Sequence, residues 1–158
     1  MAKEKLSAFV PENEQPYEVP GNWVWARGSA CLMPMTTKKP QGDIFYYIDI
    51  DAINNENQTV SLPKEILVSK APSRASRELR EGDTLFSMVR PYLKNIAYID
   101  AGLSNCIAST GFFVCKPSVA LNGKYLYFLM ISGYMVDGLN SFIKGDNSQS
   151  IRQENIYG

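Results

Sequence analysis

The sequence contains no histidine. This absence excludes Ser-His-Asp and Cys-His catalysis, histidine metal sites and imidazole proton shuttles. Cysteine is scarce: Cys31, Cys106 and Cys115 form an odd set without a Cys-x-x-Cys pair. This pattern argues against a disulfide framework or a zinc knuckle and favours a reducing, cytoplasmic setting.

The formal net charge is zero, because 16 Lys and Arg residues balance 16 Asp and Glu residues. A neutral chain that is 45% hydrophobic is unlike a disordered protein or a histone-like protein that coats nucleic acid by bulk charge. Residues 1–18 are charged and lack the apolar core of a signal peptide. The longest apolar stretch, residues 125–136, is shorter than the ~17–25 residues that span a bilayer, so we expect a buried helix and no membrane partner.

What is present suits one folded domain of 158 residues. Pro11, Pro16 and Pro20 are spaced through polar residues and favour an extended N-terminal arm over residues 1–20. We expect a single domain over residues 21–158.

Strands dominate the predicted order of elements. A short helix is expected over residues 26–33, and a longer one from about residue 124, capped by Asn122. Alternation and β-branched or aromatic content predict strands over residues 44–50, 59–62, 66–69, 84–89, 95–99, 106–109 and 111–116. The fold class expected is α+β, with a mostly antiparallel twisted sheet and a buried C-terminal helix. The predicted core includes Phe86, Val89, Ile96, Phe112 and Val114.

Catalytic signals are weak. Asp49 and Asp51 would share one face of a strand that continued past residue 50, and together with Asp83 they leave open a small carboxylate-dependent enzyme. Surface acids at a strand end are the commoner explanation. Cys106 has no histidine to activate it, so a small buried apolar role is preferred. The sequence contains neither the Gly-x-Gly-x-x-Gly motif of dinucleotide-binding proteins nor the Gly-Lys-Ser/Thr motif that binds nucleotide phosphates.

The distribution of charge is more informative than its sum. Between residues 64 and 94 the acids are Glu65, Glu78, Glu81 and Asp83. The basic residues of the same window are Lys64, Lys70, Arg74, Arg77, Arg80, Arg90 and Lys94. Seven positive and four negative charges give +3 in a neutral chain. The segment 73–77 combines cations with hydroxyl groups, which is the chemistry that binds phosphates, although a solvated basic surface is an equal alternative.

Several segments, in this order, resemble the target recognition domain of a type I restriction-modification specificity subunit. They are residues 16–27 (PYEVPGNWVWAR), 73–77 (SRASR), 81–87 (EGDTLFS), 89–97 (VRPYLKNIA) and 107–112 (IASTGF). The resemblance runs from about residue 16 to the C-terminus. It implies a fold like that of DNA methylase specificity domains.

The resemblance also implies a function. Such a subunit reads one half of a split double-stranded DNA target with each recognition domain and is not itself a catalyst. Modification subunits methylate adenine with S-adenosylmethionine, and restriction subunits add ATP-driven translocation and cleavage. We therefore expect no cofactor on this chain, with both cofactors on those partner subunits. The sequence corresponds to one recognition domain, without the spacer helices and the second domain of the family.

Roles for individual residues follow from this implied function. Arg74, Arg77 and Lys94 are expected to contact phosphates. Lys38, Lys39 and Gln41 lie in a polar loop and are expected to read base edges, since Lys suits guanine and Gln suits adenine. A second loop offers further donors: Lys144, Asn147, Ser148, Gln149 and Arg152.

Two alternatives stay open beside the DNA reader. One is a protein-interaction or adaptor module, which would lack a basic face. The other is the carboxylate enzyme, which would need an acidic pocket. A reader is expected to gather Arg74, Arg77 and the two loops on one concave surface, whereas Arg90 is expected to pair with an acid and hold a strand connection.

Overall fold

The computed structural model describes residues 8–143, 151 and 153–157 of the chain. The strands among them are β1 (Leu32–Met33), β2 (Ile44–Ile48), β3 (Ile53–Asn54), β4 (Thr59–Val60), β5 (Lys64–Leu67), β6 (Ala75–Glu78), β7 (Thr84–Ser87), β8 (Ile96–Tyr98), β9 (Ile107–Ser109) and β10 (Phe112–Pro117). The α-helices are α1 (Gly28–Cys31), α2 (Gly123–Ile131), α3 (Gly133–Asn140) and α4 (Gln153–Tyr157). Short 3-10 helices are η1 (Glu12–Glu14), η2 (Ile50–Ala52), η3 (Val68–Lys70), η4 (Pro91–Leu93) and η5 (Ala101–Leu103).

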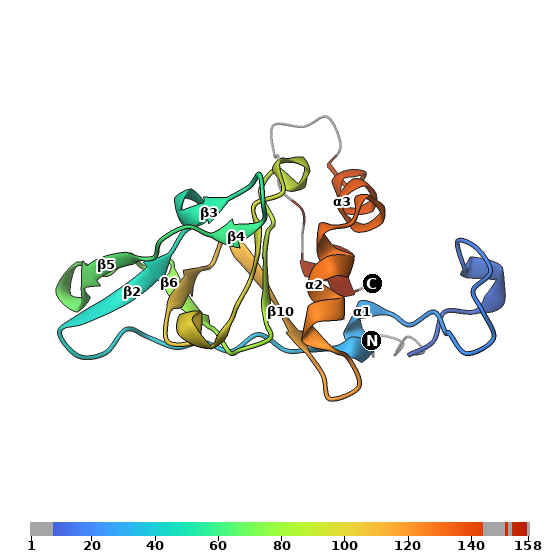
Figure 1. The fold of residues 1–158 in the computed structure, drawn as a ribbon, viewed down its shortest axis with the longest axis horizontal. Coiled ribbons are helices and arrows are strands. Elements are labelled where there is room, and N and C mark those ends of the chain that lie inside the picture. Colours follow the sequence, from blue (N-terminus) through green and yellow to red (C-terminus); the bar gives the residue numbers. More distant parts are fainter. Residues whose placement is uncertain (1–7, 144–150, 152, 158) are drawn as a thin grey trace, which may run out of the picture.

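The strands form two four-stranded sheets and a hairpin of β3 and β4. The central sheet has the order β1-β10-β7-β8 and is antiparallel throughout. The outer sheet has the order β5-β2-β9-β6, in which β2 and β9 run parallel and the other pairs antiparallel. In Figure 1 the outer sheet lies to the left, β10 lies in the middle, and the helices lie to the right.

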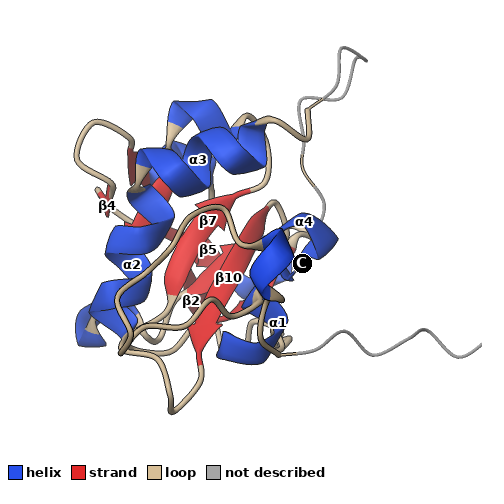
Figure 2. Ribbon diagram, turned by 90° about the vertical axis from the view of Figure 1, so that its right-hand side faces the viewer, coloured by secondary structure: helices blue, strands red, loops and turns tan. Residues whose placement is uncertain are grey.

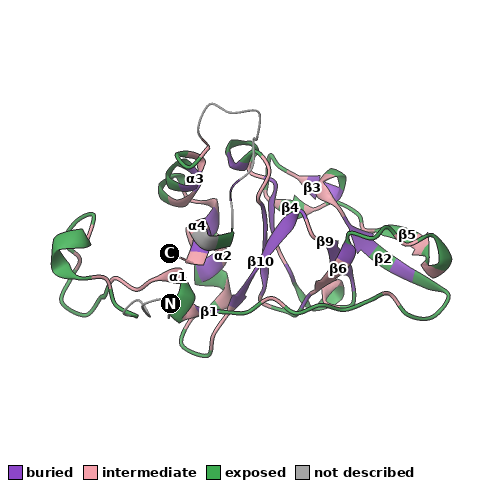
Figure 3. Cartoon of the chain, turned by 180° about the vertical axis from the view of Figure 1, so that it is seen from behind, coloured by how far each residue is buried: buried purple, intermediate pink, exposed green. Residues whose placement is uncertain are grey.

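Strand β10 is buried on both faces and joins the two main cores. Phe112 and Val114 belong to the core between the sheets, together with Ile48 of β2. Phe113 and Cys115 belong to the core beneath the helices. Side chains alternate between the two faces of a strand, so a continuous apolar run is what a strand covered on both sides requires. Figure 3 shows this buried centre, and Figure 2 shows helices α2, α3 and α4 around the near face of the central sheet.

The expected α+β class, with a largely antiparallel sheet followed by helices, is confirmed. Of the predicted core residues, Phe86, Ile96, Phe112 and Val114 are buried, and only Val89 is half-buried. The helix begins where its cap predicts, because the Asn122 Oδ1 accepts the N–H groups of residues 124 and 125 at 2.9 and 3.1 Å. No helix in the described part of the chain is long and apolar enough to cross a membrane.

One expectation about this C-terminal region is wrong. The apolar stretch 125–136 was expected to be one helix buried on several sides, but Ser132 ends α2 and caps α3. In α2 only Leu126 and Met130 are buried, while Tyr125 and Phe128 are 46% and 62% exposed. Overall hydrophobicity therefore overstated the burial, because only the i, i+4 stripe faces the sheet.

A second difference concerns Asp49 and Asp51. The strand expected over residues 44–50 ends at Ile48, and the chain turns into η2. The Asp49 Oδ1 accepts the Ile50 N–H at 2.8 Å and so caps this turn. The two carboxylates therefore do not share a strand face. An aspartate that can cap a helical turn competes with strand continuation.

Residues 8–27 project from the body of the molecule at the right of Figure 1. The Val10 N–H donates to the Trp25 carbonyl, and the Arg27 N–H donates to the Ala8 carbonyl, each at 3.0 Å. The segment thus folds back on itself across residue 20. The division into an arm over 1–20 and a domain over 21–158 stays a prediction.

Candidate nucleic-acid interface

Some basic side chains are neutralised within the molecule. Their ion pairs are Arg27–Glu14 at 3.1 Å, Arg80–Glu78 at 3.4 Å, Lys116–Asp83 at 2.6 Å, and Lys64–Asp51. Lys124 lies 4.0 Å from the centre of the Tyr98 ring, which is cation–π geometry. These cations interact with groups of the protein itself and are therefore less available to bind an anionic ligand.

The remaining basic side chains of the described residues make no ion pair there. They are Lys38, Lys39, Lys70, Arg74, Arg77, Arg90 and Lys94. The set includes every basic residue that the sequence assigned to DNA and that the structure describes. It also includes Lys70, which sequence reasoning counted in the basic window but did not select. Unpaired cations are the groups that can release counterions from DNA phosphates.

Backbone pairing brings the 34–43 segment to the outer edge of the outer sheet. The Lys38 N–H donates to the Ser76 carbonyl, and the Glu78 N–H donates to the Thr36 carbonyl, each at 3.0 Å. Thr37 therefore lies opposite Arg77 of β6, and Lys38 follows it beside Ser76, which is two residues from Arg74 along the chain. We call Lys38, Lys39, Arg74 and Arg77 the β6-edge cluster.

Exposure differs within this region. Lys38, Lys39, Gln41 and Arg74 are all exposed. Arg77 is half-buried, and its Nε has no hydrogen-bond partner among the described residues. Burial lowers the pKa of Arg77, while the neighbouring Tyr157 raises it. Arg77 is thus a partly desolvated cation, whereas Lys38, Lys39 and Arg74 of the same cluster are exposed.

Lys94 is placed elsewhere. It follows η4 in the left-handed conformation, with φ +54°, and η4 packs against α3. In Figure 1 this helix lies at the top, whereas the 34–43 segment runs along the bottom. The structure therefore joins Lys38 and Arg77 but not Lys94. Lys144, Asn147, Ser148, Gln149 and Arg152 lie outside the described residues, so the expected single concave surface stays a prediction.

Arg90 was expected to pair with an acid and so hold a strand connection. This expectation is wrong for the part of the chain that the structure describes. Arg90 is exposed and makes no ion pair with a described acid. Its φ of +48° places it in the left-handed region before Pro91. The strand connection is held instead by backbone bonds, such as that from the Leu93 N–H to the Arg90 carbonyl at 3.0 Å.

The groups considered for catalysis have structural roles. Asp83 is buried, where its Oδ2 accepts hydrogen bonds from Lys116 at 2.6 Å and from the Arg80 N–H at 2.8 Å. Burial raises the pKa of Asp83, and these two bonds oppose the shift. Cys106 is buried, and burial raises the pKa of its thiol, as the small apolar role predicts. No cluster of three metal-binding side chains occurs within residues 8–143, 151 and 153–157.

Comparison with known proteins gives a consistent result. The chain is 32% identical over 66 residues to the type I restriction enzyme HindI specificity subunit of Haemophilus influenzae, a match that covers 41% of this chain and 14% of that protein. No protein-family model matches the chain.

Solved structures match over most of the fold. One is a chain from the structural analysis of complex assembly and conformational transition of the type I R-M system, with a TM-score of 0.85 and 33% identity. Another is the HsdS subunit from Thermoanaerobacter tengcongensis, with a TM-score of 0.83 and 34% identity. Each match covers 90% of this chain and 38% of the solved chain, so the sequence spans well under half of these relatives. Specificity subunits are the non-catalytic components of type I restriction-modification complexes. The chain is similar in sequence and in fold to part of a type I restriction-enzyme specificity subunit.

Proposed function

We propose that this chain binds double-stranded DNA and reads one half of a bipartite target for a type I restriction-modification complex. The observation that carries the proposal is the β6-edge cluster. None of its four cations has an ion-pair partner among the described residues, whereas Arg27, Lys64, Arg80 and Lys116 are each paired with an acid. On a fold homologous to specificity subunits, such cations have a natural ligand in DNA phosphates.

The residues of this surface divide by role. Arg74 and Arg77 orient the chain on phosphates, and these contacts carry no sequence information. Lys38, Lys39 and Gln41 are exposed along one segment and supply base contacts in the major groove. Lys94 and the 144–152 loop extend the contact with phosphates and bases. Single DNA-binding modules bury only ~600–1,000 Å² of protein surface, so a small cluster of this kind is sufficient for one half-site.

The chain acts as a reader within an assembly. Its partners are modification subunits, which bind S-adenosylmethionine, and restriction subunits, which use ATP. The chain itself uses no cofactor and works in the cytoplasm. Because it spans 38% of the solved relatives, the half-site is the unit of recognition that we assign to it.

Selection from a randomised duplex library at low salt tests this proposal. Enrichment of a short motif of a few base pairs is the expected result, and Gln41→Ala should then change the preferred base while Lys64→Ala, whose lysine pairs with Asp51, should not. If about four cations contact phosphates, the slope of log K against log salt will be about −3.6. A purified, folded chain that shows no salt-dependent binding would exclude the function.

A further inference from the structure

Two of the segments that carry the family resemblance meet in the outer sheet. Strand β6 follows Arg74 and pairs antiparallel with β9, with an irregularity between Ala75 and Arg77. The Thr110 N–H donates to the Arg74 carbonyl at 2.9 Å. The backbone of Arg74 is therefore tied to the turn that joins β9 to β10.

The side chain of Arg74 also lies against this turn, at Gly111. A Cβ atom added to Gly111 would lie 2.6 Å from the Arg74 Nη2 and 3.8 Å from its Cζ. The next atom, the Ser109 Oγ, would be at an ordinary 3.6 Å. Gly111 does not have a positive φ, so its backbone conformation does not require glycine. A side chain at this position would instead displace the guanidinium of Arg74.

A polar network forms the floor beside this guanidinium. The buried Gly111 N–H donates to the Ser109 Oγ at 3.2 Å. Ser109, Asp49 and Arg74 are all close enough to Tyr47 to influence its pKa. Burial raises the pKa of Tyr47, while Ser109 and the positive charge of Arg74 oppose that shift.

These contacts place Arg74 against the turn without giving its guanidinium an ion pair. Its carbonyl is fixed at Thr110, its guanidinium lies against Gly111 beside Tyr47, and the side chain remains exposed without an ion pair to any described acid. An arginine whose backbone is fixed and whose guanidinium has room beside the turn loses less conformational freedom when it binds a phosphate with two parallel hydrogen bonds.

We infer that Gly111 is a positioning residue, which keeps open the space in which the Arg74 guanidinium is held for a DNA phosphate. The inference rests on the proposed DNA-binding function and deepens it. It explains why a glycine without backbone strain occupies the turn opposite Arg74.

A double-mutant cycle on the full chain tests the inference. Arg74→Ala should weaken binding to the selected duplex about tenfold, the scale of one charge-assisted contact. Gly111→Ala should weaken it about three- to tenfold when Arg74 is present and cause no further loss in the Arg74→Ala background. Gly138→Ala is the matched control, because a Cβ there meets nothing within 4 Å, and it should leave affinity unchanged.

Two further measurements separate positioning from a structural role. The urea midpoint of Gly111→Ala should equal that of wild type, because the displaced atoms are the far end of a flexible side chain. In the free protein, the Arg74 Nε–H resonance should move toward its random-coil position in Gly111→Ala. Equal losses of affinity in both backgrounds would overturn the inference, as would an unmoved resonance. If Arg74→Ala weakens binding and Gly111→Ala does not, the inference alone fails; if the folded wild type does not bind, the proposed function fails with it.

Discussion

The cations of the β6-edge cluster differ in their partners from those of residues 8–27 and α2. The division does not follow the two sides of the molecule strictly, because Lys64 and Arg80 on the outer-sheet side are paired, and Arg90 and Lys94 near α3 make no ion pair with a described acid. On the helical side, Arg27 pairs with Glu14, and Lys124 lies over the Tyr98 ring. Along β6, by contrast, Lys38 and Arg74 make no ion pair with a described residue. A chain with zero net charge therefore separates cations that serve the fold from cations left for a ligand. Net charge alone conceals such a division.

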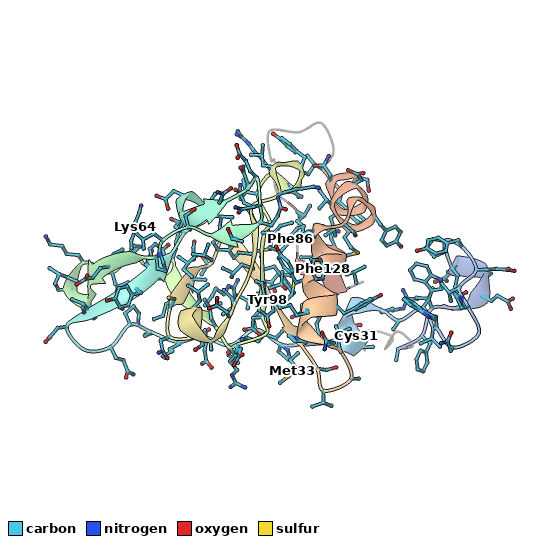
Figure 4. All side chains as sticks on the ribbon, viewed as in Figure 1. Cys31, Met33, Lys64, Phe86, Tyr98 and Phe128 are labelled. Carbon is cyan, nitrogen blue, oxygen red and sulfur yellow. The ribbon has the colours of Figure 1, made fainter. Side chains whose placement is uncertain are left out.

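The aromatic residues show the complementary pattern. On the helical side, Trp25 lies 6.0 Å from Tyr134 between ring centres, and Trp23 lies 6.4 Å from Tyr125. These contacts join residues 8–27 to α2 and α3. Figure 4 shows the two regions, with Phe128 on α2 and Lys64 on β5 at opposite sides of β10. The predictions below test whether the two regions are separate in stability and in DNA binding.

The largest effect, on stability, is expected at the buried ion pair of Lys116 and Asp83. Asp83→Ala should lower the free energy of unfolding by about 3–5 kcal/mol, because Lys116 would stay buried without a counterion. Urea denaturation followed by tryptophan fluorescence measures the change. Replacing both residues with apolar ones, Asp83→Leu with Lys116→Met, should recover much of the loss. A small effect of Asp83→Ala would mean that Lys116 reaches solvent, and that paired and unpaired cations are not distinct classes.

The β6-edge cluster should show the next largest effect, on binding and not on stability. Lys38→Ala combined with Arg74→Ala should weaken DNA binding about 100-fold and make the salt slope about 1.8 less negative. The matched control, Lys64→Ala with Arg80→Ala, also removes two cations from this half of the molecule, but these cations are paired. Fluorescence anisotropy across a salt series measures the affinity and the salt slope of both double variants. Equal losses in the two double variants would indicate that binding responds to bulk charge.

Sequence reasoning identified the elements with strong local signals. The apolar run of β10 and the cap at Asn122 are local patterns, so the bounds of the strand and the start of the helix were predicted closely. Strand β6 was missed because three of its four residues are polar, and because it pairs on both edges, with β9 and with the 36–38 segment. No local pattern encodes partners 30 residues or more away.

The candidate site was predictable in composition but not in arrangement. The cations around Arg74 were visible as a window of charge, yet their separation from Lys94 depends on how η4 packs against α3. The role of Gly111 depends on the approach of the Arg74 guanidinium, which the sequence does not show. Asp49 was grouped with Asp51 because the sequence does not show that the strand ends at Ile48.

A smaller effect is expected at the cap of α2. Asn122→Ala removes two hydrogen bonds to backbone N–H groups and should lower the free energy of unfolding by about 1 kcal/mol. Asn122→Asp, which keeps the acceptor, should retain most of the stability. DNA affinity of both variants should equal that of wild type at temperatures where they are folded. A loss of affinity would couple the helical side to the DNA surface.

The smallest effect is expected at Phe128, which is 62% exposed on α2. Phe128→Ser should change the free energy of unfolding by about 0.5 kcal/mol, because most of the ring is already in water. It should leave both DNA affinity and the salt slope unchanged, since the ring lies on the opposite side of β10 from the outer sheet. Fluorescence anisotropy with the selected duplex measures the affinity and the salt slope. A tenfold loss would place an apolar side chain of α2 at the DNA, as in proteins that insert such side chains between bases, and would reverse the assignment of the two regions.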